Sequence, residues 1–394
     1  MPAQALHIAS PRRFAPDKLG VLIGALGTVA LILPFTLFRA NRIVLGESRS
    51  IAESLPQWHA ILLYAAVGAA LLVGLLRLKR ALRLLISFVL LAVLLLSLGQ
   101  AASFLTPSGN TYARVSPGAG FWLLVFAFAL MATDALARLK PAPVVRILIL
   151  AGVIAAFALM LWSGTFRNLS ILREYNTRAG TFWAEAQIHL WLAFGSVALA
   201  SVIGIPLGIV CHRVRPLRSA VLGVLNIVQT IPSIALFGLL IAPLAWVAAN
   251  VPGAAAIGIS GIGFAPAMVA LIAYSLLPVV ANTVVGLAGV PEAAADAARG
   301  MGMTVPQRLL SVELPLAFPV ILTGIRIVLV QNIGLATIAA LIGGGGFGVF
   351  VFQGIGQTAM DLVLLGAVPT VGLAFAAAII MDAVVELARG RRTA

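Results

Sequence analysis

Five polar side chains interrupt long apolar stretches in the second half of the chain, and they are the residues best suited to chemistry inside a membrane. They are Gln229, Asn282, Arg326, Gln331 and Asn332. Polar groups in hydrocarbon are costly unless they face a protein interior or a water-filled cavity. These side chains therefore either line a path for a polar solute or bond across helices, and the sequence leaves both interpretations open. Arg326 could bind a substrate carboxylate, but a structural ion pair is the favoured interpretation.

Two acids and a histidine are further candidates. Asp382 and Glu386 lie one helical turn apart near the end of the last apolar stretch, as an acid pair for proton coupling would. Three arginines follow at 389, 391 and 392, so pairing with them is the favoured interpretation. His189 lies near the start of another apolar stretch, and we interpret it as a packed interface residue rather than a ligand.

The motifs of catalysis and cofactor binding are missing from the sequence. Cys211 is the only cysteine, which excludes an intramolecular disulfide or a cysteine metal cluster. No lysine follows a glycine-rich run, so the chain lacks the P-loop of an ATPase. The run Gly343–Gly346 has no strand ahead of it, which favours a tight re-entrant turn over a phosphate cradle. We expect no catalytic residue, metal site or cofactor.

The composition indicates a membrane protein. Of 394 residues, 61% are hydrophobic and 10% are charged, against roughly 45–50% and about 25% in soluble domains. The net charge of +14 comes from basic residues in the short breaks between apolar runs. That distribution is typical of membrane loops and not of a nucleic-acid-binding face, so no nucleic-acid partner is predicted.

Apolar stretches long enough to cross a bilayer predict an all-α polytopic membrane protein with about ten transmembrane helices. They lie near 20–38, 58–76, 84–104, 119–137, 145–163, 188–210, 219–242, 265–289, 316–342 and 362–388. Most of the 26 Lys and Arg residues then fall in alternate loops, which places both termini in the cytoplasm. The first stretch is predicted to be an uncleaved span rather than a signal peptide.

The sequence predicts two parts joined by a polar linker. Residues 1–163 hold five simple spans with few buried polar residues, and we interpret them as accessory. Residues 164–187 form the linker, on the extracytoplasmic side. Polar residues, Gly and Pro enter the spans of residues 188–390, where we expect function.

The segment 291–315 is the longest predicted cytoplasmic loop between spans, and it has a clear pattern. Glu292 to Arg299 is a strong helix-forming run with acids near its start, and Gly300 and Gly302 break it. Thr304 and Gln307 predict a capping box for a second short helix, which Pro315 is expected to end. Physics alone leaves two interpretations: an interfacial hairpin without a partner, or a knob that fits a partner's groove.

The spacing in this loop resembles the EAA loop of bacterial ABC importer permeases. That motif has Glu-Ala-Ala, a Gly after three residues, and Ile/Val-x-Leu-Pro after nine more. Here the matching residues are Asp296, Ala297, Ala298, Gly302, Val312, Leu314 and Pro315. The sequence departs at the first position, where Asp keeps the charge with a shorter reach. Glu292, one turn earlier, is the candidate to supply the missing contact.

Residues 185–390 as a whole resemble permeases for glycine betaine, choline and related osmoprotectants, and the five extra spans resemble a long form of that branch. The matching segments are 189–209, 229–241, 298–304, 312–326 and 342–355. The resemblance implies a permease core of about five helices in the bacterial inner membrane and a second permease chain, expected to be an identical copy. It also implies cytoplasmic ATPase subunits docked on the EAA loops and an extracytoplasmic substrate-binding protein.

An ion-gradient-driven secondary transporter of a small polar solute is the alternative. Such transporters often contain inverted repeats and midplane ion sites. The sequence shows no convincing repeat and few acids within the spans. Dependence on ATP, as opposed to a proton or sodium gradient, separates the two hypotheses.

Overall fold

The computed structural model describes residues 18–41, 44–75, 79–107, 109–110 and 112–390. Its residues form two compact units. Unit 1 comprises residues 1–141 and 154–173, and unit 2 comprises residues 142–153 and 174–394. Helix α6 (Pro143–Trp162) therefore contributes one half to each unit.

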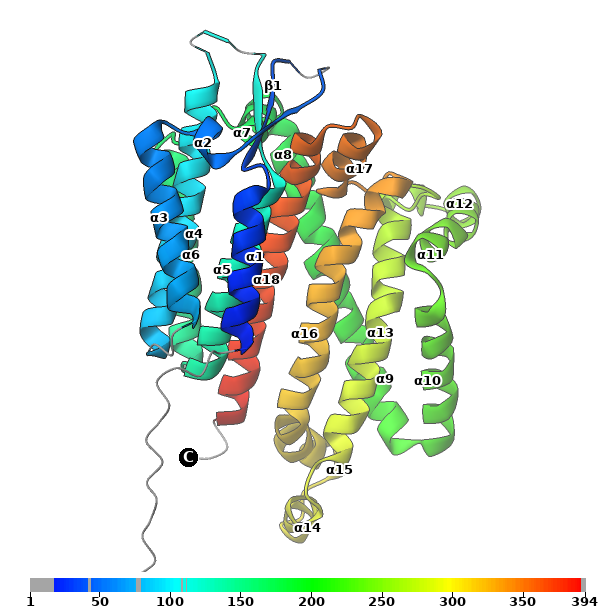
Figure 1. Ribbon diagram of the computed structural model, residues 1–394. Coiled ribbons are helices and arrows are strands. Elements are labelled where there is room, and N and C mark those ends of the chain that lie inside the picture. Colours follow the sequence, from blue (N-terminus) through cyan, green and yellow to red (C-terminus); the bar gives the residue numbers. More distant parts are fainter. Residues whose placement is uncertain (1–17, 42–43, 76–78, 108, 111, 391–394) are drawn as a thin grey trace, which may run out of the picture. The chain divides into compact units, whose positions relative to one another are not determined.

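Unit 1 is a helical bundle with a small sheet at one end of its helices (Figure 1). Its elements are α1 (Lys18–Ile32), β1 (Thr36–Arg39), β2 (Glu47–Arg49), α2 (Ile51–Ser54), α3 (Gln57–Leu75), α4 (Arg80–Leu105), β3 (Arg114–Pro117) and α5 (Ala119–Leu139). The antiparallel sheet has the order β2-β1-β3, and Leu37 faces Ser48 on one side and Ser116 on the other. Leu94, Leu124, Phe128 and Met131 are fully buried in the core between the helices.

Unit 2 contains α18 (Met360–Gly390), the longest helix among the described residues. Its elements after α6 are α7 (Ser170–Thr177), α8 (Ala179–Leu190), η1 (Trp191–Gly195), α9 (Ser196–Arg213), α10 (Arg215–Thr230), α11 (Ser233–Leu239), α12 (Ile241–Asn250), η2 (Ala255–Ile257), α13 (Phe264–Ala288), α14 (Glu292–Gly300), α15 (Val305–Arg308), η3 (Leu309–Glu313), α16 (Leu314–Ile338), η4 (Ala339–Ile342), α17 (Gly348–Gly356) and α18 (Met360–Gly390). The first four residues of α7 belong to unit 1.

Helix α13 lies at the centre of unit 2, packed against α9, α10 and α16, and α16 packs in turn against α18 (Figure 1). Small residues allow this close approach. A Cβ at Gly208 of α9 would lie 2.6 Å from the Thr283 Cβ of α13, and one at Gly324 of α16 would lie 2.8 Å from the Pro278 carbonyl oxygen. Such contacts are typical of membrane helices, whose association depends on close packing.

The ten predicted spans largely match helices. The number of helices that count as membrane spans depends on the minimum helix length that is required. Among the described residues, eight helical segments have the length and composition to cross a membrane, and two shorter apolar helices, Lys18–Ile32 and Gln57–Leu72, fall on the first two predicted spans. The first prediction extended too far, because the helix ends at Ile32 and β1 begins at Thr36. The sheet of unit 1 was not predicted. Several basic residues used for orientation, Arg12, Arg13, Arg77, Arg391 and Arg392, lie outside the described residues.

The prediction of one continuous span at 219–242 is wrong. Helix α10 ends at Thr230, and α11 begins at Ser233 after a break. Pro232 explains the break, because the residue before a proline is driven out of the helical region, and Ile231 is extended with ψ 127°. The segment long enough to cross a membrane here is Ser233–Asn250. The predicted linker 164–187 also contains helix: α7 and the start of α8.

Candidate functional site

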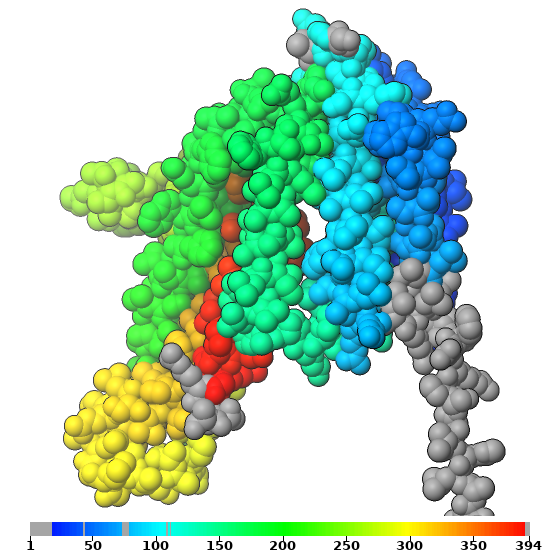
Figure 2. Space-filling model, turned by 90° about the vertical axis from the view of Figure 1, so that its left-hand side faces the viewer, coloured from blue at the N-terminus to red at the C-terminus, as the bar shows by residue number. Residues whose placement is uncertain are grey.

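The 291–315 hairpin has the predicted local structure in its first part. Helix α14 begins at Glu292, its C-cap is Met301, and Gly302 then adopts a left-handed φ of 79°. Glycine adopts this conformation without steric cost. Thr304 and Gln307 form the capping box that opens α15. Figure 2 shows these residues as a yellow lobe at the lower end of unit 2.

The prediction that Pro315 ends the second helix is wrong. The chain stays helical from Val305 to Ile342, and Pro315 sits in the first turn of α16. The turn before it, η3, is a π-helix, in which the Leu314 N–H bonds the Leu309 carbonyl five residues back. A proline lacks the N–H that a continuing α-helix needs. The widened turn and the position of Pro315 early in α16 reconcile the proline with unbroken helix.

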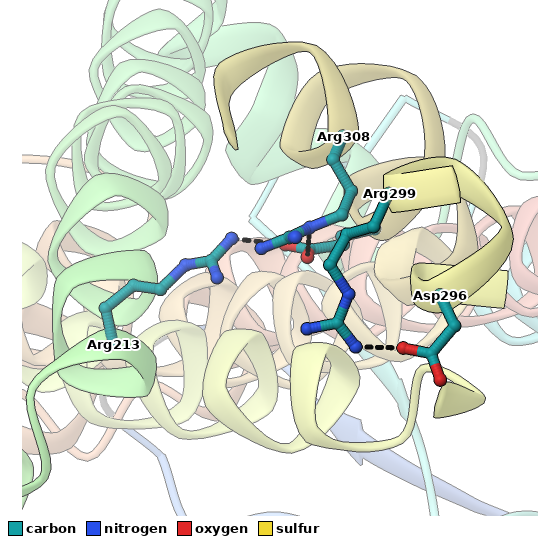
Figure 3. Close-up of polar contacts among 5 residues, drawn as sticks. Arg213, Asp296, Arg299 and Arg308 are labelled. Carbon is teal, nitrogen blue, oxygen red and sulfur yellow. Dashed lines mark hydrogen bonds and ion pairs between the residues drawn. The ribbon is translucent and has the colours of Figure 1, made fainter. Parts of the chain in front are cut away.

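Most residues that match the EAA motif lie on the surface of the lobe. Asp296, Ala297, Gly302 and Pro315 are exposed, as are Glu292 and Gly300, while Val312 and Leu314 are half-buried and Ala298 is buried. Asp296 pairs with Arg299 within α14 (Figure 3). A Cβ built on Gly300 or Gly302 would meet no atom within 4 Å. The lobe therefore presents open space at its glycines.

An apolar patch completes this surface. Met301, Val305 and Leu310 are 70%, 58% and 65% exposed on consecutive parts of the hairpin. No sequence motif distinguishes these three residues, and their only signal in the sequence is their position close to Gly300 and Gly302. Exposed apolar side chains gathered on one hairpin are candidates for contact with a protein partner or with the membrane surface.

A buried acid, Glu313, lies where the hairpin joins α16. It accepts hydrogen bonds from Arg213 Nη2 at the end of α9 (2.5 Å) and from Arg308 Nε of α15 (2.8 Å). Figure 3 shows the guanidinium groups of Arg213 and Arg308 converging. The sequence pattern assigns no site role to any of these three residues. One signal was available: Glu313 is the only acid between Asp296 and Asp361.

Asn332 joins three helices at the centre of unit 2. Its side chain is fully buried, and its amide nitrogen donates to Ser196 Oγ of α9 (2.7 Å) and Ser275 Oγ of α13 (2.8 Å). The Ser196 hydroxyl donates in turn to the Leu192 carbonyl of η1, and the Ser275 hydroxyl donates to the Leu271 carbonyl of its own helix. The bonds from Asn332 run between helices, as the second of the two interpretations of these polar residues expects.

The other amide candidates lie in different surroundings. Gln229 Nε2 donates to the Tyr274 carbonyl (2.7 Å), which ties α10 to α13. Asn282 Nδ2 donates to the Pro278 carbonyl one turn earlier in its own helix (2.8 Å). Gln331 is half-buried beside Asn332 on α16. The hydrogen bonds described for Gln229, Asn282 and Asn332 each lead to a different partner rather than to one another.

Arg326 and the two acids of α18 form ion pairs between helices. Arg326 Nη1 lies 2.5 Å from Asp382 Oδ1, joining α16 to α18, and Arg146 of α6 pairs with Glu386. The arginines expected as partners lay after the acids in sequence, but the structure provides partners from other helices. All four residues belong to unit 2.

The run Gly343–Gly346 forms a tight turn between η4 and α17. Gly343, Gly345 and Gly346 all have positive φ, and the Gly346 N–H donates to Glu185 Oε2 of α8 (2.6 Å). His189 is buried beside this turn, with its ring 4.9 Å from that of Phe347. The turn therefore packs against α8.

Two family models match the chain in separate regions. Residues 202–390 match "Binding-protein-dependent transport system inner membrane component", and residues 17–172 match "ABC transporter permease YehY, N-terminal domain". The second match covers most of the region interpreted as accessory.

Curated relatives match part of the chain. The "Osmoprotectant import permease protein OsmW" of Salmonella typhimurium is 46% identical over 45% of this chain and 78% of its own length. The "Choline transport system permease protein OpuBB" of Bacillus subtilis is 34% identical over 57% of this chain and 94% of its own length. The "Glycine betaine/carnitine/choline transport system permease protein OpuCB" of Bacillus subtilis is 36% identical over 55% and 91%.

Proposed function

Because this chain belongs to the family of binding-protein-dependent inner membrane transport components, we propose that it is the permease of an ATP-driven osmoprotectant importer. Glycine betaine or a related quaternary amine is the proposed substrate, since the printed names of the relatives include glycine betaine, choline and carnitine. ATP is hydrolysed by separate cytoplasmic ATPase subunits, and the permease itself carries no catalytic site. An extracytoplasmic binding protein delivers the substrate.

The observation that carries this proposal is the surface of the 291–315 hairpin. It combines exposed α14, open space around Gly302 and the apolar patch of Met301, Val305 and Leu310. A cytoplasmic ATPase that docks here gains direct access to α16, because the helix runs from Val305 into that span. ATP-driven closure of two ATPases then switches a permease dimer, proposed as identical chains, between inward-open and outward-open states.

The remaining assignments follow from this arrangement. Both termini and the hairpin lie on the cytoplasmic side, and the helices of unit 1 are accessory to ATPase docking. Asn332, Gln229 and the Arg326–Asp382 pair hold helices of unit 2 together. Gln331, half-buried beside this framework, is the candidate to contact a solute.

The experiment is affinity purification of the tagged chain from native membranes, comparing wild type with Gly302→Asp. Wild type should retain an ATPase, and the variant should lose it while reaching the membrane normally. Gly253→Asp is the matched control, because Gly253 has a φ of 83° against 79° at Gly302, and both have open space at Cβ. The two substitutions impose the same backbone strain, so only the place differs.

Three other outcomes are informative. If wild type retains no ATPase in mild detergent, ion-coupled transport becomes the better hypothesis. Uptake that survives ATP depletion but collapses with the proton or sodium gradient would support the same conclusion. If both glycine variants lose the ATPase, strain rather than docking explains the effect.

A further inference from the structure

Glu313 is a buried acid at the junction between the hairpin and a membrane-spanning helix. Its side chain is 9% exposed, and it lies in the last position of η3, where the hairpin becomes the span α16. A carboxylate in such a place needs compensating charge and hydrogen bonds. Arg308 supplies one from within the hairpin, and Arg213 supplies the other from α9.

The contact with Arg213 joins the hairpin to a helix outside it, α9, whereas Arg308 belongs to the hairpin itself. The chain connects the hairpin to α13 on one side and α16 on the other, whereas α9 ends 78 residues before the hairpin begins at Pro291. Any displacement of the hairpin passes to α13 and α16 through the backbone. It reaches α9 only through packing and side chains, and the Glu313–Arg213 pair is a charged link between them.

The π-turn sets the direction of this side chain. A π-turn holds one more residue than an α-turn, and one residue corresponds to about 100° of helical rotation. Glu313 is the last residue of that turn. Its orientation toward both arginines therefore depends on the irregular turn, and π-turns of this kind are frequent at functional sites.

We propose that Glu313 is a positioning residue that links the 291–315 hairpin to the inner end of α9. When the partner ATPase displaces the hairpin, the two arginine contacts make α9 move together with α16. Without the carboxylate, two guanidinium groups face one another and repel, and α9 is joined to the hairpin and α16 only through packing. The inference rests on the proposed function, because it assigns the link a role in transmitting ATPase movement.

The test uses the full chain with its ATPase and binding protein in proteoliposomes, and measures radiolabelled glycine betaine taken up per ATP hydrolysed. Glu313→Gln keeps an oxygen acceptor but removes the charge, and Arg213→Ala removes the partner on α9. Each should retain the ATPase on purification while uptake per ATP falls about tenfold, within the range of ordinary coupling free energies. The double variant should fall no further, because both changes break one link.

Arg215→Ala is the matched control, since Arg215 is an exposed arginine two residues beyond Arg213. It should leave uptake per ATP within twofold of wild type. Glu313→Asp keeps the charge and is expected to recover part of the lost coupling, which a purely structural defect would not show.

Several results would overturn the inference while leaving the proposed function intact. These are unchanged uptake per ATP in Glu313→Gln, additive losses in the double variant, or equal loss in Arg215→Ala. Loss of the ATPase from a correctly inserted Glu313→Gln protein would make Glu313 a docking residue instead. A wild-type chain that binds no ATPase would overturn both proposals together.

Discussion

The two units differ in where along their helices polar side chains are buried. In unit 1, buried polar contacts lie near helix ends: Thr36 with Ser54 beside the sheet, and Arg83 near Asp134. The middle of its helices is packed with residues such as Leu94 and Phe128. In unit 2, Asn332, Ser196 and Ser275 meet inside the bundle. The difference suggests that unit 1 is built for uniform apolar packing, whereas unit 2 depends on directional contacts in hydrocarbon.

The largest expected effect comes from placing a polar group in the middle of unit 1. Leu94→Asn should lower the free energy of unfolding by about 3–5 kcal/mol. The substitution leaves a cavity and buries an amide group among apolar side chains that cannot form hydrogen bonds with it. The shift in denaturation midpoint of the purified protein measures it. Leu94→Met, which conserves volume, should cost less than about 1.5 kcal/mol. A tolerated asparagine would remove the contrast between the units.

The reverse substitution in unit 2 should have a smaller effect. Asn332→Leu removes two hydrogen bonds between helices and should cost about 1–2 kcal/mol, since such bonds in membranes are individually modest. Thermal unfolding of the purified protein provides the measurement. Gln331→Leu, at the half-buried neighbouring position, is the control and should change stability by no more than about 0.5 kcal/mol. If Asn332→Leu stabilises the protein, the directional contact is not what holds α9, α13 and α16 together.

The smallest effect should come from the pair between α16 and α18. The side chains of Arg326 and Asp382 are 38% and 39% exposed, so breaking the pair with Arg326→Met should cost only about 1 kcal/mol. Membrane abundance should fall, while competition between glycine betaine and choline for uptake should stay unchanged. The exchange Arg326→Asp with Asp382→Arg should restore abundance. Normal abundance with altered substrate competition would instead place Arg326 at the substrate.

The sequence predicts the helices, and parts of the hairpin, because those features depend on neighbouring residues. Helix α14, the turn at Gly302 and the Thr304–Gln307 capping box are set by local spacing and glycine conformation. The break before α11 could have been predicted in the same way, since Pro232 acts on the residue beside it.

Contacts between residues far apart in the sequence could not be predicted from it. Asn332 forms hydrogen bonds with residues 136 and 57 positions away in the sequence, Ser196 and Ser275. From the sequence alone, either serine could equally have lined a water-filled path. Glu313 falls at the variable position of a recognised motif, where nothing local indicates its arginine partners. The strands of unit 1 are three or four residues long, too short for a periodic pattern.

The unbroken helix from Val305 to Ile342 makes the hairpin and the span a single lever. Its 38 residues correspond to a rod of about 57 Å at 1.5 Å per residue. If such a rod pivots near its midpoint, a tilt of about 5° displaces its ends by roughly 2.5 Å in opposite directions. The far end carries the glycine turn at 343–346, next to Glu185 and His189 of α8. An inward pull at the lobe would then draw that turn the other way across α8, and the fulcrum would lie between Thr323 and Gly324.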